Sequence, residues 1–139
     1  YKATQVQADK RKNTFTANIA TAYPAEAEVE SWIRSYSLQK GQLRISDSFR
    51  LTTAKQPNQI NFMTWGQVNT EIPGKIQLEV KGKKAVIEYD KQLFDVKTEI
   101  IPLTDTRLSN VWGKSICRIT LTATNIYKTG NYSFTIKKQ

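Results

Sequence analysis

The sequence predicts an all-β protein, specifically a two-layer antiparallel β-sandwich with one or two very short helical turns. Apolar and polar residues alternate with a period of two through most of the chain, and turn residues interrupt this alternation at short intervals. About ten short strands separated by turns are typical of two packed antiparallel sheets. The 139 residues show no change in composition and no repeat. We therefore expect one domain, residues 1–139, without a linker.

The N-terminal quarter predicts two strands and a short helix. The strands are expected over Ala3–Ala8 and Thr14–Ile19. Pro24–Val29 predicts one or two helical turns, because proline suits the first helical position and good helix formers follow it. Within this segment, Glu26 and Glu28 are expected to interact favourably with the helix N-terminus.

Ser31–Leu38 predicts a strand that has Trp32, Arg34, Tyr36 and Leu38 on one face. Large aromatic side chains on an alternating strand usually belong to a core. We therefore expect Trp32 and Tyr36 to face the interior.

Two more strands are predicted before the middle of the chain. Gly41 ends the preceding strand, and Gln42–Leu51 is the next, with a kink expected near Asp47. Ile60–Trp65 is short and apolar on both faces, which indicates an interior strand.

The central segment predicts a meander of three strands. Lys75–Val80 and Lys84–Tyr89 alternate strongly and flank Lys81–Lys83, which has the composition of a tight turn. A second turn then leads into a strand over Leu93–Lys97.

The C-terminal part predicts one helical turn and two strands. Thr104–Leu108 favours the helical turn, Ser115–Ala123 alternates as a strand, and Lys128–Asn131 indicates a turn before the strand Tyr132–Ile136. Cys117 lies on the apolar face of its strand, so we expect a small buried hydrophobic residue.

The composition excludes several chemistries. The chain has no His and a single Cys, which excludes a Ser-His-Asp triad, a Cys-His pair, an internal disulfide and a thiolate cluster. The acidic residues Asp47, Asp90, Asp95 and Asp105 are scattered, so each is interpreted as a solvated turn or capping residue. No cofactor, metal site or catalytic residue is predicted.

The charge predicts acidic partners. Lys and Arg exceed Asp and Glu by 9, an excess that attracts anionic polymers through counterion release. The candidate contacts for an anionic polysaccharide are Lys81, Lys83, Lys84 and Trp112. The competing interpretation is a solvated hairpin tip, in which case the attraction is non-specific and is lost near physiological salt.

A series of short segments, in order along nearly the whole chain, forms a recognisable pattern: Asn13-Thr14-Phe15, Ile19-Ala20, Ala22-Tyr23-Pro24, Ser31-Trp32, Arg34, Tyr36, Lys40-Gly41, Ile45-Ser46-Asp47, Phe49, Lys55-Gln56-Pro57, Asn61-Phe62-Met63-Thr64, Asp105, Leu108, Val111-Trp112-Gly113, Arg118-Ile119 and Leu121. In these segments the chain resembles the C-terminal β-sheet region of bacterial heparinase II/III-like polysaccharide lyases.

The resemblance implies a fragment of a multidomain lyase that cleaves acidic polysaccharides, such as glycosaminoglycans, by β-elimination. Catalytic residues of that family lie mainly in an α/α toroid, so none is carried over to this chain. It further implies a periplasmic or secreted bacterial protein whose partner is the missing catalytic part, with contact to the polysaccharide and none to a membrane. The chain begins with Tyr1 rather than Met, which fits a piece of something longer.

Two alternatives remain open at this point. One is a stand-alone carbohydrate-binding β-sandwich, which predicts a groove with coplanar exposed Trp or Tyr rings. The other is a basic nucleic-acid-binding domain, which is disfavoured because no basic-aromatic strand motif is present. A large exposed apolar patch would instead favour packing against a missing domain.

Overall fold

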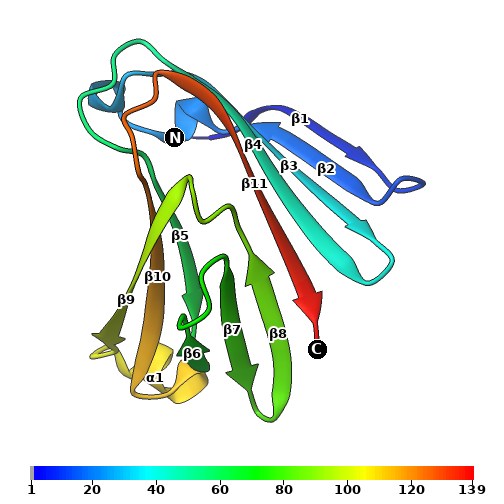
Figure 1. Cartoon of the computed structure of the whole chain (residues 1–139), viewed down its shortest axis with the longest axis vertical. Helices are drawn as coiled ribbons and strands as arrows, with labels where there is room; N and C mark the ends of the chain where they lie inside the picture. Colours follow the sequence, from blue (N-terminus) through cyan, green and yellow to red (C-terminus); the bar gives the residue numbers. More distant parts are fainter. Residues whose placement is uncertain (1) are drawn as a thin grey trace. The chain divides into compact units, whose positions relative to one another are not determined.

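The computed structural model describes residues 2–139, which form two compact units. One unit consists of the chain up to Gln56 together with Ile126–Lys138, and the other of Pro57–Asn125 with Gln139. Strands account for 59% of the structure and are antiparallel, and among the described residues only one α-helix and two short 3-10 turns occur (Figure 1). The predicted all-β sandwich class is confirmed.

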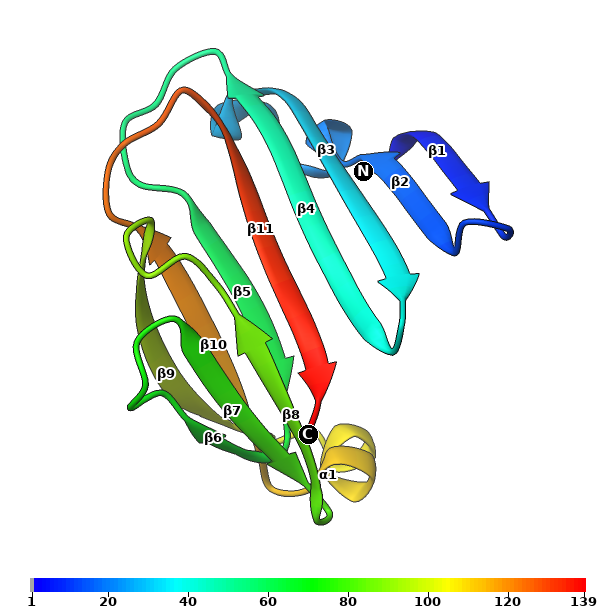
Figure 2. The same cartoon turned by 45° about the vertical axis from the view of Figure 1, so that its right-hand side comes forward.

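The first unit contains one run of antiparallel strands in the order β1-β2-β3-β4-β11 (Figure 2). Its elements are β1 (Thr4–Asp9), β2 (Thr14–Asn18), η1 (Ala20–Ala22), η2 (Ala25–Ala27), β3 (Val29–Gln39), β4 (Gln42–Leu51) and β11 (Thr129–Lys138). Each of these strands begins and ends within three residues of the bounds predicted from the alternation of apolar and polar residues. The helix expected at Pro24–Val29 is the single 3-10 turn η2, with Pro24 at its N-cap.

A stack of three rings forms the core of this unit. The ring centroid of Phe49 lies 4.9 Å from that of Trp32 and 4.8 Å from that of Tyr132. Gly130 pairs with Phe49 across the strands, and a Cβ atom at Gly130 would lie 2.9 Å from the Phe49 Cζ. The turn predicted at Lys128–Asn131 is therefore wrong, because this glycine serves ring packing within β11 rather than chain reversal.

Two expectations about Asp47, a kink in its strand and a solvated side chain, are wrong. It lies in regular register opposite Arg34, so β4 has no kink there. Its side chain is fully buried and accepts two hydrogen bonds of 2.7 Å, from Nε and Nη2 of Arg34. It is thus one half of an internal ion pair and not a solvated turn residue. On the same face of β3, Trp32 is buried as predicted and Tyr36 is half-buried, whereas Leu38 is exposed.

The second unit contains two antiparallel runs, β8-β7-β6 and β5-β10-β9 (Figure 2). Its elements are β5 (Gln59–Thr64), β6 (Gln67–Asn69), β7 (Lys75–Val80), β8 (Lys83–Glu88), β9 (Phe94–Pro102), α1 (Thr106–Trp112) and β10 (Ser115–Ala123). Side chains from both runs are almost completely buried and form the core: Ile76, Ile87, Ile119 and Leu121. Cys117 is buried beside them, as expected.

The predicted three-strand meander is only partly correct. β7 and β8 form the expected hairpin, whose turn residues Lys81 and Gly82 both have positive φ, as the favoured two-residue turn requires. β9, however, pairs with β10 and not with β8. The chain turns between β8 and β9, where the Asp90 side chain accepts a hydrogen bond from the backbone N–H of Gln92, and β9 then belongs to the other run.

The strand predicted over Ile60–Trp65 is β5, but it lies at the edge of its run rather than in the interior. Ile60 is buried, whereas Met63 is 52% exposed. The apolar residues on the two faces of β5 therefore have different roles. One face contributes to the core, and the other forms part of the surface groove described next.

Candidate functional site

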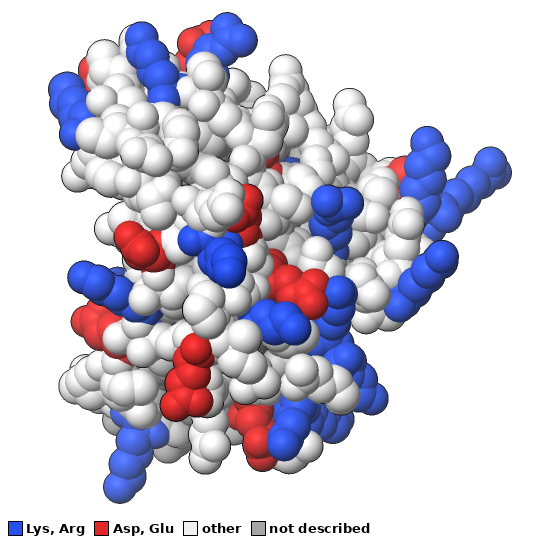
Figure 3. All heavy atoms as spheres, in the orientation of Figure 1, with Lys and Arg blue, Asp and Glu red and all other residues white. Residues whose placement is uncertain are grey.

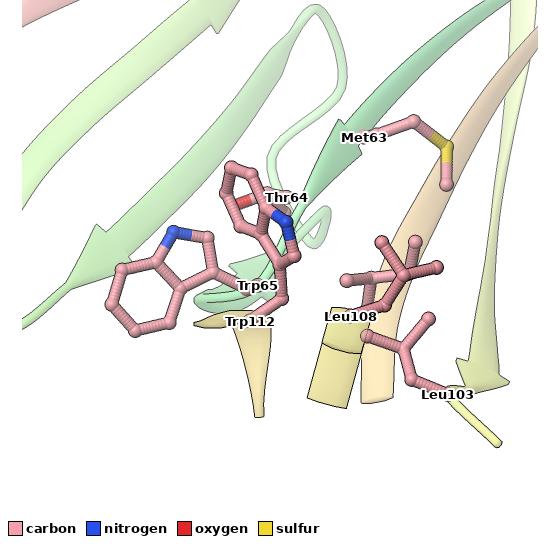
Figure 4. A pocket seen from close by; sticks show the side chains of 7 residues that line it. Met63, Thr64, Trp65, Leu103, Leu108 and Trp112 are labelled. Carbon is pink, nitrogen blue, oxygen red and sulfur yellow. The ribbon is translucent and has the colours of Figure 1, made fainter. Parts of the chain in front are cut away.

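Trp65, Lys81 and Trp112 come together in the second unit from three different elements. Trp65 follows β5, Lys81 lies in the β7–β8 turn, and Trp112 is the last residue of α1. The Lys81 Nζ lies 5.1 Å from the centroid of the Trp65 ring, within the range of a cation–π contact. The two indoles meet edge to face, with centroids 6.5 Å apart and an interplanar angle of 75° (Figure 4).

Helix α1 places Trp112 through its caps. The Asp105 side chain accepts hydrogen bonds from the backbone N–H groups of Arg107 at 2.8 Å and Leu108 at 3.4 Å. The side-chain hydrogen bond from Arg107 is the main reason that the pKa of Asp105 is lowered. At the other end, Gly113 has φ 89° and closes the helix. The capping role predicted for Asp105 is confirmed, and the helical turn expected at Thr104–Leu108 is part of α1, which continues to Trp112.

Trp65 is held by the glycine that follows it. A Cβ atom at Gly66 would lie 2.2 Å from the backbone oxygen of Glu79 and 2.5 Å from Cγ2 of Val80. No side chain fits in that space, so the backbone after Trp65 lies directly against the end of β7. This contact brings the indole next to the hairpin turn that carries Lys81.

An apolar groove of about 280 Å³ opens on one side of the two indoles (Figure 4). It is lined by Met63, Thr64, Trp65, Leu103, Leu108, Trp112 and Ile116. Leu108, which lines the groove, is 48% exposed, and Val111 on the same helix is 70% exposed. The edge-to-face indoles do not form the coplanar platform that sugar-binding sandwiches are expected to show.

A second depression, of about 330 Å³ and mixed polarity, is also lined by Trp65. Its remaining lining residues are Gly66, Gln67, Glu79, Val80 and Lys81. It therefore combines an aromatic wall with an ammonium group, an amide and a carboxylate. Trp65 belongs to both cavities and forms part of the wall of each.

The structure separates the three lysines of the hairpin tip. Lys81 lies over Trp65, whereas the Lys84 Nζ is 3.8 Å from the Glu79 carboxylate. Lys83 is exposed at the start of β8 and lines neither cavity. Figure 3 shows blue side chains around this hairpin with red carboxylates among them, so the surface is not a uniform basic stripe. Of the four predicted contact residues, Lys81 and Trp112 are brought together, through Trp65.

Trp65 is the member of the cluster that is absent from the contact residues predicted from the sequence. Its position at the end of an apolar strand indicated an interior residue, and only the edge location of β5 exposes it. A pattern of alternating residues does not distinguish edge strands from central strands, so no signal in the sequence identified it.

Two features of the described residues bear on other chemistries. Among residues 2–139, no cluster of three or more His, Cys, Asp or Glu side chains is placed to hold a metal ion. None of the described helices is long and apolar enough to span a membrane.

The fold and the site define an all-β protein with an aromatic-lined apolar groove beside a basic hairpin. Neither a family model nor a curated protein matches the chain. Among solved structures, it is similar to heparan sulfate lyase HepC from Pedobacter heparinus, with a TM-score of 0.66 and 12% identity, and to a mutant of that enzyme, with a TM-score of 0.68 and 11% identity. Both matches cover 99% of this chain but only 22% of theirs. The chain thus has the fold of a part, about one fifth, of a heparan sulfate lyase.

Proposed function

We propose that this chain is a non-catalytic, C-terminal β-domain of a heparinase-like lyase that acts on an acidic polysaccharide. The observation that carries the proposal is the structural match, which takes in 99% of this chain and a minor part of a heparan sulfate lyase. The same proposal includes a periplasmic or secreted location in a bacterium.

The residues of the site support a non-catalytic role. β-Elimination needs a base, an acid and a group that neutralises the substrate carboxylate. The apolar groove offers hydrocarbon, two indoles and the Thr64 hydroxyl, none of which ionises near neutral pH. The ionisable side chains beside it, Glu79 and Lys81, line the separate mixed depression. The buried carboxylate of Asp47 is held by Arg34.

The apolar groove supports a structural role for the domain. Exposed apolar side chains gathered at one place usually mark an interaction site. We assign the remaining part of the same lyase polypeptide as the occupant, because the matched enzymes extend far beyond the region that this chain covers. The exposed side chains of Met63, Leu108 and Val111 then become the contact that buries α1 against that part.

Co-expression of this chain with the catalytic part of its lyase tests the proposal. We expect the pure chain to produce no unsaturated uronate from heparan sulfate, and the two parts to co-purify. Leu108→Glu should abolish co-purification, whereas Ile126→Glu, an equally exposed apolar position in the other unit, should not. Turnover by the pure chain would refute the non-catalytic role, and equal effects of the two substitutions would refute the groove as the contact.

A further inference from the structure

We infer that the mixed depression between Trp65 and Lys81 is a binding site for a single acidic pyranose unit, such as a uronic acid residue of a polysaccharide. The site consists of Trp65, Gln67, Glu79 and Lys81. It is distinct from the apolar groove assigned to domain packing, because Trp65 is the one lining residue that the two cavities share. It shares with the proposed function only the class of ligand.

The size and the aromatic wall fit one sugar ring. A volume of about 330 Å³ lies at the lower end of the range for small-ligand sites, which is about 300–1,000 Å³. The faces of a pyranose carry C–H groups of slight positive charge, and these pack on the negative face of an indole. Gly66 keeps that indole fixed at the edge of the depression, because its backbone lies against Glu79 and Val80.

The charge of Lys81 selects an acidic sugar. Its ammonium group lies over the Trp65 ring, with Nζ 5.1 Å from the ring centroid. A sugar that stacks on this face takes the place of the ammonium group, and the flexible side chain of Lys81 can then turn to the carboxylate of the sugar. A charge-assisted hydrogen bond of this kind is roughly twice as strong as a neutral one. Lys84 does not supply an equivalent charge, because it faces the Glu79 carboxylate.

Gln67 and Glu79 favour a sugar over a nucleotide. Both side chains carry oxygen acceptors, and sugar hydroxyl groups donate hydrogen bonds to such acceptors. A uronic acid unit offers several hydroxyl donors to these acceptors beside its single carboxylate, whereas a phosphate group has no such donors near neutral pH. The polar lining of the depression thus complements hydroxyl groups, while Lys81 complements the single carboxylate.

Titration of the isolated chain with an unsulfated uronate-containing tetrasaccharide tests the site. The readout is the indole N–H resonance of each tryptophan, recorded at about 0.15 M ionic strength, where non-specific attraction is largely screened. We expect the Trp65 signal to shift and the signal of buried Trp32 to stay. The methyl ester of the same tetrasaccharide, which lacks the carboxylate charge, should bind about fivefold or more weakly.

Lys81→Gln and Lys83→Gln form a matched pair, because each removes one charge from the same hairpin. Lys81→Gln should weaken binding about fivefold and cancel the preference for the acid over the ester, whereas Lys83→Gln should change affinity less than about twofold. Trp65→Leu should weaken binding at least about tenfold, and Trp65→Phe should retain part of it even if the leucine variant is misfolded.

Equal losses in the two lysine variants would overturn the site and leave only counterion release. Equal affinity for the acid and the ester would overturn the role of Lys81. Displacement of the sugar by single-stranded nucleic acid, with the same tryptophan shifted, would assign the depression to a different ligand. The groove variant Leu108→Glu serves as a control, since it disrupts packing with the lyase but should leave the sugar titration unchanged. The two proposals can therefore fail independently.

Discussion

Replacing Arg34 with alanine should strongly destabilise the first unit. The Asp47 side chain that remains has none of its surface exposed and would lose both of its hydrogen bonds from the guanidinium group. Removing one partner of a buried ion pair typically costs about 3–5 kcal/mol, because the other partner is left as an uncompensated buried charge. That loss is comparable to much of the stability of an ordinary domain.

The two partners should not be equivalent. Arg34 keeps 23% of its side chain exposed, so after Asp47→Ala its guanidinium can turn toward water, and we expect a smaller loss of about 1–3 kcal/mol. The double substitution of both residues by leucine removes both charges together. It should therefore be less destabilising than Arg34→Ala alone.

Urea unfolding measures these differences if only the first unit is observed. Trp32 is the tryptophan of that unit, so its emission in a Trp65→Phe/Trp112→Phe background isolates the relevant transition. A loss below about 1 kcal/mol for Arg34→Ala, or a double leucine variant as unstable as the single one, would refute the reasoning about the buried charge.

The pH dependence gives a second check on the same pair. The hydrogen bond to Asp47 raises the pKa of Arg34 above its already high value. A group whose pKa is raised on folding stabilises the protein below its unfolded pKa and loses that effect only as the pH rises through the folded value. The contribution of the guanidinium should therefore be constant up to strongly alkaline pH.

Three further predictions concern single positions. Trp32→Ala should cost about 3–5 kcal/mol, whereas Trp32→Phe should cost less than about 1.5 kcal/mol, since the buried indole N–H has no hydrogen-bond partner to lose; urea unfolding compares the two. Gly66→Ala should destabilise the second unit by about 1–3 kcal/mol and shift the Trp65 indole resonance, because its Cβ would collide with the Glu79 backbone; an unchanged spectrum would contradict this. Asp105→Ala should fray the N-terminal end of α1 and speed amide hydrogen exchange at Arg107. In the native protein the pKa of the Asp105 carboxyl group is lowered, so its stabilising effect on α1 should be lost only as the pH falls through that lowered pKa.

The parts of the fold that were predictable from sequence are those set by local residues. The β7–β8 hairpin follows from alternation around a Lys-Gly turn, and Asp105 caps α1 because a carboxylate before a helical segment meets free N–H groups. Strand pairing is not local, which explains why β9 was placed next to β8. Alternation along β9 is the same whichever strand lies alongside, so it does not indicate that β9 pairs with β10.

In the candidate site, too, some residues could be predicted from their local sequence and others could not. Lys81 and Trp112 could be selected from residue type and position, since a lysine in a turn and a tryptophan beside a glycine are expected at the surface. Trp65 in this site could not, and neither could the burial of Asp47 in the first unit, because the environments of both residues depend on partners distant in the sequence. Trp65 is exposed because β5 is an edge strand, and Asp47 is buried because Arg34 lies opposite it.

Trp65 connects the two proposals physically. One side of its cluster borders a groove of hydrocarbon, where water is readily displaced by an apolar protein surface. The other borders a depression with Lys81, Gln67 and Glu79, where polar groups need hydrogen-bonding partners and an apolar surface would leave them unsatisfied. A protein domain packed on the first surface would not cover the second favourably, so a sugar bound beside Lys81 and a packed α1 are compatible. Because both depend on the position of one indole, Gly66→Ala should impair sugar binding and co-purification together, whereas Lys81→Gln should impair the first alone.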